Sequence, residues 1–539
     1  MAEFLYSYSN NIINKYHSES VDDYLNLFKD ITFVDNGLLL ISNNNTVKEL
    51  LIGENKIIII GYAFCSDITI EEYFAMVLHS NVINDVLISE IKKKVHGSYI
   101  ILCSVENIMY VFSDFLQTRN VFYSVKNNLI SSSYKIISDS NDKEKFDEYK
   151  LFEYLAMRHI VYPSFVSNST IYHDIFCLRA YEYIKIDLIY GHFDVLDLYI
   201  HINNKKNISL DILSNKTANE LNKIICNPKF KNNKIGLTLT GGFDSRLIST
   251  IAKDYYINSK YRISVFQNKY SKDYLIASRI SKITNKELLK FEMIPDIHIP
   301  LLYLVSDGFT PKENSIISPL FLDKNFELCF GGAFGTELYN PINYDSISDF
   351  IDGILDNVKK VFINAECHIT QLKEELYNEF EQINRHYLME ENNERDLIRL
   401  FILNSTAKFS SPMQSAYNIF GLNFEPFGAF PIIELGMRIP EKTNNNNKLG
   451  KNFIIQKKIM YRLNKRISLI LSTRYSPLSP LNLISFIPYV IGHINLYLDT
   501  KQRSKKINNN QIKLNYKDWV YFSDNWYEGF INNYIYHNN

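Results

Sequence analysis

Hydrophobic and polar residues alternate in short runs up to about residue 140, and turn residues separate the runs. Alternation with a period of two predicts half-buried β-strands. Two segments, 70–78 and 84–93, instead repeat their apolar residues at helical spacing. Strands on either side of helices indicate an α+β sandwich. The predicted strands cover residues 37–42, 56–62, 97–105, 108–114, 120–123 and 128–133.

The pattern changes after residue 234. Residues 235–239 are apolar, two glycines follow, and the next residues have helical spacing, so a strand, a tight turn and a helix are expected. Apolar runs at 262–267 and 327–330 alternate with further helical patterns, which predicts a parallel sheet with ligands at the carboxyl ends of its strands. Mostly helical structure is expected over 347–387 and 394–420.

The stretch Thr240–Ser245 has the chemistry of a phosphate cradle. Gly241 and Gly242 let the backbone approach a ligand closely, and the N–H groups at the start of the following helix favour an anion. Asp244 lies in the first helical turn, where its carboxylate would repel a phosphate unless a divalent cation bridged the two. Helix capping is the alternative role for Asp244. The stretch therefore points to a metal–nucleotide site.

Length and composition set the outer limits. A chain of 539 residues is too long for one core, and the change of pattern divides it into residues 1–205 and 206–539. With 46% hydrophobic and 22% charged residues it can fold as an ordinary globular protein. The start lacks the features of a signal peptide and the six cysteines lack CxxC spacing, so a cytoplasmic protein with reduced, mostly buried thiols is expected.

The balanced charge gives no global attraction to nucleic acid or to an anionic membrane. The 58 basic and 59 acidic residues cancel to a net charge of −1, so no nucleic-acid and no membrane partner is expected. Residues 481–498 are the most membrane-like segment, but polar residues interrupt them and they fall short of a clean apolar span of about 20 residues. We predict a buried helix or loop there. Residues 501–517 are rich in Lys, Arg and Asn, and a solvated face is favoured over a nucleic-acid patch.

Several motifs together resemble the asparagine synthetase superfamily. Leu239–Ser245 is similar to its pyrophosphate-binding SGGxDS loop, and Ala333–Glu337 to its second metal loop, GxGSD, with Thr and Glu in place of Ser and Asp. Glu425–Phe427 and residues 451–461 resemble later elements of the synthetase domain. The resemblance, over about residues 35–480, implies an N-terminal amidotransferase-like αββα sandwich followed by a parallel-sheet ATP-pyrophosphatase (adenine nucleotide alpha hydrolase-like) domain with C-terminal helices.

The front part, over residues 96–133, resembles the second half of a glutamine amidotransferase domain. In that family the glutaminase nucleophile is a cysteine directly after the initiator methionine, and here the position is Ala2. Cys65 is another thiol nearby, for which a buried structural cysteine is favoured. The front domain is therefore expected to be structural or to recognise substrate.

The resemblance implies adenylation. A substrate carboxylate attacks the α-phosphate of ATP, pyrophosphate leaves, and an amine then displaces AMP to form an amide. Bringing two anions together requires Mg²⁺ and donors around the pyrophosphate. Asp244 and Glu337 are the implied metal ligands, although Glu337 could instead be a first-turn residue favoured by the helix dipole. The implied nucleotide-binding residues are Thr240, Gly241, Gly242, Asp244, Ser245 and Gly335, with adenine near Ser264, Val265 and Phe266.

The departures from the family concern proton transfer and charge. Phe334 stands where asparagine synthetases have Glu and β-lactam synthetase has Tyr, and it cannot move a proton. Glu425 is the nearest substitute carried by a motif. The family's late lysine has no clear counterpart, and Arg474 could supply its charge. Arg246 could contact phosphate or a carboxylate substrate, or form a surface salt bridge, and both roles stay open.

The first hypothesis is therefore an ATP- and Mg²⁺-dependent amide-forming ligase without its own glutaminase. It would act on a small-molecule or peptide carboxylate and an amine, as lasso-peptide cyclases and β-lactam synthetase do. A non-catalytic nucleotide-binding protein and a conventional glutamine-hydrolysing asparagine synthase are the alternatives. The oligomeric state is open, with a homodimer as one candidate.

Overall fold

The computed structural model describes most of the chain. The described residues are 4–7, 28–34, 37–42, 47–79, 83–132, 137, 147–158, 165–170, 172–266, 272–293, 326–340, 342–363, 365–420, 422–440, 453–473, 475–507 and 514–515. Ala2 and Arg474 lie outside these residues, and so do the side chains of Val265 and Phe266.

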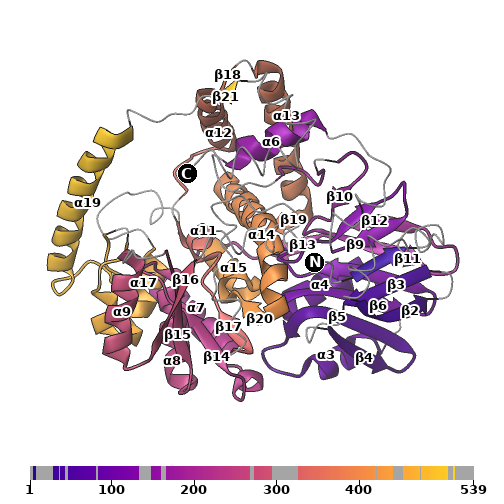
Figure 1. The fold of residues 1–539 in the computed structure, drawn as a ribbon, viewed down its shortest axis with the longest axis horizontal. Coiled ribbons are helices and arrows are strands. Elements are labelled where there is room, and N and C mark those ends of the chain that lie inside the picture. Colours follow the sequence, from indigo (N-terminus) through magenta and orange to yellow (C-terminus); the bar gives the residue numbers. More distant parts are fainter. Residues whose placement is uncertain are drawn as a thin grey trace.

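Two antiparallel sheets form the front part of the molecule (Figure 1). The first has the strand order β10 (Phe176–Cys177), β8 (Phe122–Ser124), β9 (Leu129–Ser131), β1 (Phe4–Ser7), β3 (Gly37–Ser42), β2 (Phe28–Val34). The second has the order β12 (Phe193–Asp197), β11 (Glu182–Asp187), β7 (Ile108–Ser113), β6 (His96–Val105), β5 (Asn55–Phe64), β4 (Val47–Ile52).

Alternation along β5 shows how this sandwich is held together. Ile58 and Ile60 belong to the cluster buried between the two sheets, whereas Ile57 and Ile59 join the larger core on the opposite face. That opposite face is covered by α3 (Ile70–Val77) and α4 (Asp85–Lys94). All six predicted strands and both predicted helices of this region are present, and the described residues supply three layers of the expected four.

A five-stranded parallel sheet follows. Its order is β16 (Leu288–Met293), β15 (Lys260–Phe266), β14 (Ile235–Thr238), β17 (Leu328–Phe330), β20 (Leu422–Phe424). From β14 the chain builds outward in one direction through β15 and β16, and then returns to β14's other side with β17. The topological switch point therefore lies between β14 and β17, which is where open α/β sheets bind ligands.

Helices surround the parallel sheet and rise above it in Figure 1. The long helices expected from the sequence are present. They are α12 (Ile347–Val361), α13 (Glu366–His386) and α14 (Glu394–Phe420). The others are α6 (Glu148–Arg158), α7 (Leu210–Ile225), α8 (Asp244–Tyr255), α9 (Lys272–Thr284), α11 (Gly335–Tyr339), α15 (Phe430–Met437), α17 (Ile454–Leu463), α18 (Lys465–Ser468) and α19 (Phe486–Ile507). Short 3₁₀ turns lie at Pro228–Phe230 and Pro426–Gly428.

The front part and the parallel-sheet part share one core. Phe64 of β5 packs edge-on against Phe424 of β20, with ring centroids 5.3 Å apart. The short strand β13 (Ile200–Ile202) pairs with β19 (Tyr387–Met389), and β18 (Phe362–Ile363) with β21 (Leu514–Asn515). β13 lies before the predicted boundary at residue 205, and its partner β19 lies after it. The boundary itself stays a sequence-based prediction.

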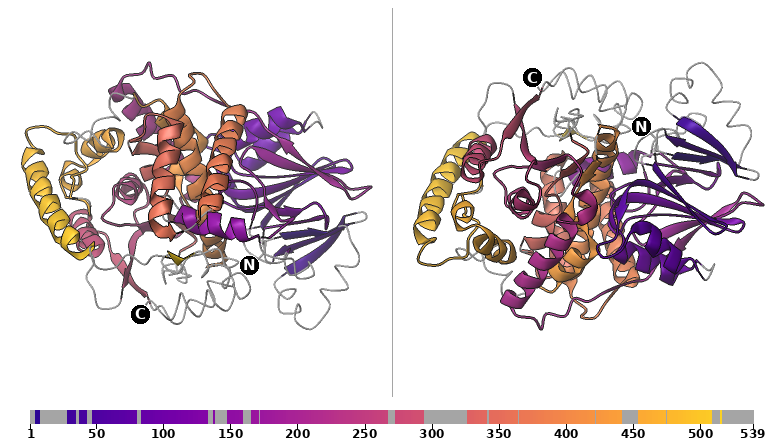
Figure 2. Two further views of the ribbon diagram at one scale, coloured as in Figure 1. Left: turned by 90° about the horizontal axis from the view of Figure 1, so that it is seen from above. Right: turned by 90° about the horizontal axis from the view of Figure 1, so that it is seen from below.

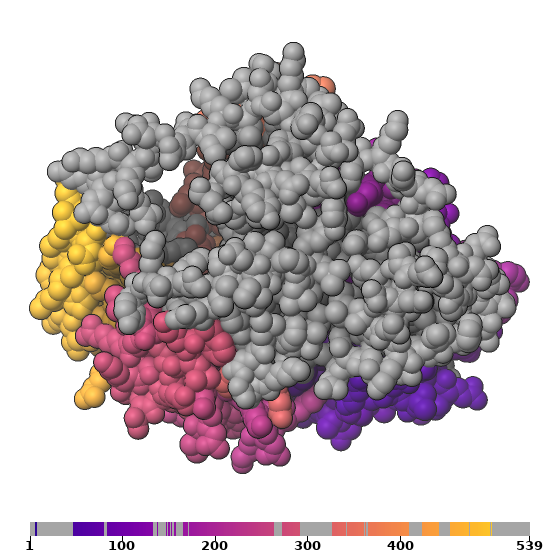
Figure 3. Space-filling view, in the orientation of Figure 1, coloured from indigo at the N-terminus to yellow at the C-terminus, as the bar shows by residue number. Residues whose placement is uncertain are grey.

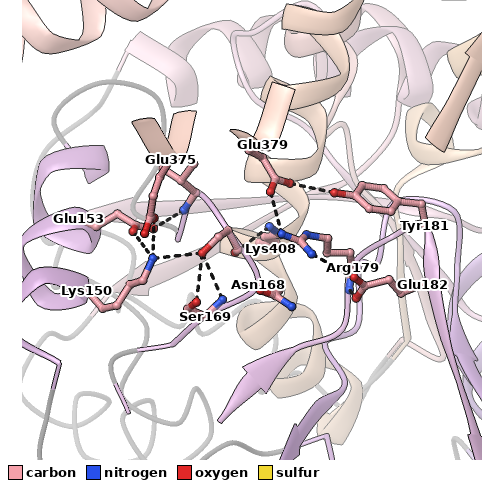
Figure 4. Close-up of polar contacts among 12 residues, drawn as sticks. Lys150, Glu153, Asn168, Ser169, Arg179, Tyr181, Glu182, Glu375, Glu379 and Lys408 are labelled. Carbon is pink, nitrogen blue, oxygen red and sulfur yellow. Dashed lines mark hydrogen bonds and ion pairs between the residues drawn. The ribbon is translucent and has the colours of Figure 1, made fainter. Parts of the chain in front are cut away.

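Buried ion pairs also join the two parts (Figure 4). Lys150 of α6 contacts Glu153 at 2.7 Å and Glu375 of α13 at 2.5 Å. Close by, Arg179 pairs with Glu379 of α13 at 3.2 Å. Glu153 is fully buried, and burial raises its pKa despite the lysine beside it.

The cysteines agree with the expectation of reduced thiols. All six are free. Cys65 is buried, and burial raises the pKa of its thiol to about 11, so it is not a reactive thiolate at neutral pH. This supports the structural role predicted for Cys65.

The prediction for residues 481–498 was wrong in part. A helix is present, α19, but it stands at the edge of the molecule (Figures 2 and 3). Most of its described apolar side chains are exposed. Helical periodicity is set by the residues themselves, whereas burial depends on what packs against them, so the sequence pattern could not distinguish the two. Within the described part of the chain, no helix is both long and apolar enough to cross a membrane.

Candidate functional site

Three loops meet at the carboxyl edge of the parallel sheet. Thr240–Phe243 follows β14, Gly331–Phe334 follows β17, and Glu425 follows β20, and these three strands are direct neighbours. The residues predicted to form the site from two distant motifs are therefore brought together at the switch point.

The first loop is folded around its own hydroxyl groups. The Thr240 N–H donates to Ser245 Oγ at 3.1 Å, the two hydroxyl oxygens lie 2.8 Å apart, and the Gly242 N–H donates to Thr240 Oγ1 at 3.2 Å. The Gly241 N–H donates to a carboxylate oxygen of Asp273, in α9, at 2.6 Å. The loop thus already holds one anionic oxygen, which is the property a phosphate cradle needs.

The second loop packs directly on the first, and its glycines make this possible. A Cβ at Gly332 would lie 2.4 Å from the backbone nitrogen of Ser245, and one at Gly335 would lie 2.6 Å from Asp244 Cγ. Neither contact leaves room for a side chain. The glycines of this loop therefore serve the approach of two backbone segments.

The Asp244 carboxylate joins three segments. It accepts a hydrogen bond from Thr336 Oγ1 of α11 at 2.6 Å and another from the Gln456 amide of α17. The N-cap of α8 is Phe243, and it has no side-chain cap. Asp244 therefore does not cap its own helix, and the alternative role considered for it is excluded.

Gly332→Ala should separate the two loops. Because the added methyl would meet backbone that cannot rotate away, we expect the second loop to shift and the thermal unfolding midpoint to fall. Binding of ATP and Mg²⁺, the ligands expected from the sequence, should weaken by about tenfold or more. Calorimetric titration with ATP and Mg²⁺, together with a thermal melt, measures both. Unchanged affinity would contradict the close packing of the loops.

Two residues predicted to be catalytic, Arg246 and Glu425, make contacts that hold the loops in place. Arg246 is fully buried, and its guanidinium donates to the carbonyls of Ile470 at 2.7 Å and Gly241 at 3.0 Å. Arg246 is therefore not part of a surface ion pair, and it holds the first loop in place. Its expected contact with phosphate or a carboxylate substrate stays a prediction. Glu425 accepts from the Ala333 N–H at 2.6 Å and from Asn423 at 2.9 Å, which positions the second loop. Its expected part in proton transfer stays a prediction.

The remaining predicted residues are placed as follows. Glu337 is partly buried in the first turn of α11, two residues after Gly335, the glycine that lies against Asp244. The backbone of Val265 and Phe266 ends β15, beside β14. Phe334 is fully buried, has a left-handed backbone (φ 70°) and packs near Gly428, so this departure from the family is a core residue.

Sequence reasoning missed Lys457. It lies on α17, next to Gln456, and is 1% exposed. Its ammonium lies 5.9 Å from the ring centroid of Phe243, at the start of α8, and 5.4 Å from that of Tyr489. Burial lowers the pKa of Lys457 to about 7. Ile455, Ile459 and Met460 are apolar and buried, so they mark the inner face of α17. This apolar pattern is the sequence signal that could have directed attention to Gln456 and to Lys457 beside it.

Lys457 should make stability depend on pH. Because its folded pKa lies below the ordinary lysine value, the unfolded chain binds this proton more tightly, and stability falls as pH drops from about 10.5 to about 7. We expect Lys457→Met to remove on the order of 2 kcal/mol of this pH dependence. Urea unfolding of both proteins without nucleotide, at about pH 9.5 and about pH 7, tests the difference. Parallel pH profiles would contradict it.

A cavity of about 1010 Å³ lies elsewhere. Its lining includes Lys234 and Ile235, which lead into β14, and Ser259 and Lys260, which begin β15. It therefore opens at the amino ends of the strands, opposite the glycine loops, and is not the predicted nucleotide site.

Similarity to known proteins is found among solved structures. No family model and no curated protein matches the chain. Among solved structures, NMN synthetase from Francisella tularensis is 18% identical, with 25% of this chain and 58% of that protein covered and a TM-score of 0.19. The NH3-dependent NAD synthetase from Campylobacter jejuni is 17% identical over 33% of this chain and 87% of that one, also with a TM-score of 0.19.

A third solved structure overlaps a larger part of the chain. Glutamine phosphoribosylpyrophosphate amidotransferase from B. subtilis is 11% identical over 44% of this chain and 53% of that one, with a TM-score of 0.19. The chain thus spans little more than half the length of two of these three proteins.

Proposed function

We propose that the chain is an ATP- and Mg²⁺-dependent ligase that adenylates a substrate carboxylate and joins it to an amine, releasing pyrophosphate and AMP. One observation carries the proposal. Two glycine loops from adjacent parallel strands converge on the Asp244 carboxylate at the switch point of the sheet. Phosphate-binding backbone and a carboxylate at one place fit a nucleotide that carries a metal ion.

The pyrophosphate would lie along Thr240–Ser245. The contact between the Gly241 N–H and Asp273 supports this, because a carboxylate oxygen occupies the direction that a phosphate oxygen would take. Adenine would lie at the end of β15, near Val265 and Phe266. Arg246 and Glu425 would hold the two loops in position without touching substrate.

The carboxylates fit a metal ion that arrives with ATP. Among the described residues, no group of three or more His, Cys, Asp or Glu side chains could hold a metal by itself. Mg²⁺ in nucleotide sites is usually held by one or two carboxylates together with phosphate oxygens, so a pair is sufficient. Asp244 and Glu337 are the proposed pair. The bound ion would offset the negative charge of ATP during attack by the substrate carboxylate.

Lys457 is the proposed source of positive charge near the phosphates. Arg474, the residue expected from the sequence to supply this charge, lies outside the described residues. Burial lowers the pKa of Lys457 from its ordinary value to about 7, so the side chain is partly neutral at physiological pH. A bound polyphosphate would favour its charged form. Its burial beside Phe243 keeps this charge away from water.

Products of ATP turnover test the proposal. The purified protein, given ATP, Mg²⁺ and a panel of carboxylates and amines, should release pyrophosphate and AMP, and should not hydrolyse glutamine. Formation of ADP and phosphate would contradict adenylation. Tight ATP binding by calorimetry, without turnover of any substrate pair, would favour the non-catalytic alternative, for which the buried Phe334 is the supporting observation.

A further inference from the structure

α19 exposes a continuous apolar surface. Its exposed large hydrophobic residues are Phe486, Ile487, Val490, Ile491, Ile494, Tyr497 and Leu498. At about 100° per residue these positions fall within one sector of roughly 140° around the helix. Just before the helix, Leu481, Leu483 and Ile484 extend the surface, and Leu483 is 96% exposed. We call these ten residues the apolar stripe.

The other side of α19 is attached to the molecule. Tyr489 is 2% exposed, and its hydroxyl donates to the Ser479 carbonyl at 2.6 Å. Gly492 lies so close to the backbone of Tyr475 that a Cβ would be 1.9 Å from its carbonyl oxygen. The helix is therefore held with its apolar face outward, the reverse of an amphipathic helix on a protein core. In Figure 3 it forms one edge of the molecule.

The chain becomes basic where the apolar stripe ends. Lys501, Arg503, Lys505 and Lys506 lie within the last two turns of α19, after a single acidic residue, Asp499. By helical spacing, positions 501 and 505 continue the sector of the apolar stripe. The chain as a whole has a net charge of −1, so this is a local concentration of positive charge. Apolar positions followed along the same helix by basic residues are consistent with a helix that lies in an anionic membrane interface.

We propose that α19 binds the surface of an anionic membrane, parallel to its plane. The apolar stripe would enter the boundary between headgroups and acyl chains, and the basic end would contact anionic headgroups. The apolar part, 486–498, is too short to span a bilayer, which needs about 20 residues. A nucleic acid would use the basic end and leave the apolar stripe in water. This inference differs from the sequence-based expectation of no membrane partner, which the vesicle experiment tests.

Cosedimentation of the full chain with vesicles tests the inference. Vesicles of phosphatidylglycerol mixed with phosphatidylcholine should bind the protein, salt should weaken the binding, and phosphatidylcholine alone should bind less. Ile487→Ser/Ile491→Ser/Ile494→Ser should weaken binding by about tenfold or more, because three exposed apolar side chains are lost. Lys501→Gln/Lys505→Gln should remove most of the preference for phosphatidylglycerol.

A matched control separates the apolar stripe from general hydrophobicity. Ile257 is 81% exposed but lies before β15, away from α19, so Ile257→Ser should leave vesicle binding unchanged. Equal sedimentation of the triple variant and the wild type, with both folded by circular dichroism, would overturn the inference. A dimer in sedimentation velocity that the triple variant abolishes, without vesicle binding, would also overturn it and assign the apolar stripe to a second copy.

Discussion

Asp244→Asn should reduce ATP-dependent pyrophosphate release by about 10²-fold to 10³-fold. The substitution removes the negative charge of the proposed metal ligand and changes little else in size. The carboxylate now receives two donors, Thr336 Oγ1 and the Gln456 amide, and the asparagine oxygen can still accept from one of them. We therefore expect the loops to stay folded while affinity for ATP with Mg²⁺ falls more than affinity for ATP with EDTA.

The control for Asp244→Asn is another aspartate in a first helical turn. Asp349 lies in the first turn of α12, is exposed and lies outside the three loops, so Asp349→Asn should leave both affinity and turnover unchanged. Pyrophosphate release and calorimetry are measured for both variants. If Asp244→Asn keeps full affinity for ATP with Mg²⁺, the metal-bridged nucleotide site is wrong.

Lys150→Met should destabilise the fold by about 3–5 kcal/mol, because it leaves two carboxylates without their cation in a buried site. Glu153 is fully buried and Glu375 is 21% exposed. Glu153 also accepts a hydrogen bond from the Val166 N–H at 2.6 Å, which fixes it in place. Urea unfolding followed by circular dichroism measures the loss.

Two companion variants identify the cause. Lys150→Met/Glu153→Gln should recover part of the stability, because the second change removes the unpaired charge. Lys373→Met breaks an exposed pair between α13 and Asp352 of α12, and should cost at most about 1 kcal/mol. If Lys150→Met costs no more than Lys373→Met, the buried network does not hold the two parts together.

Local pattern was sufficient for much of the fold. The alternation at 56–62 and 97–105 recurs as β5 and β6 because each successive side chain faces a different core, and that requirement is written into the residues themselves. β4 was missed because its edge position leaves Lys48, Glu49 and Leu51 exposed, so its alternation is weak. The two glycine loops could be located because glycine between a strand and a helix is a local signal.

The roles within the site depend on contacts that no local pattern contains. The carbonyl that Arg246 holds belongs to Ile470, and Glu425 holds the N–H of Ala333. Both arginine and glutamate in a motif resemble catalytic groups until their partners are known. Lys457 could not be recognised from the sequence, because a lysine within a helix is usually exposed to water and this one is buried.

The carboxylate of Asp273 should lower the measured affinity for ATP, because it occupies the Gly241 N–H of the first loop. It is a ligand tethered to the same chain, so its effective concentration at the Gly241 N–H is fixed by the fold and cannot be diluted away. A phosphate that enters the loop has to compete with it. The dissociation constant measured for ATP is then the intrinsic constant divided by the fraction of molecules in which Asp273 has moved aside. A modest measured affinity would thus be compatible with a loop whose fit to phosphate is good.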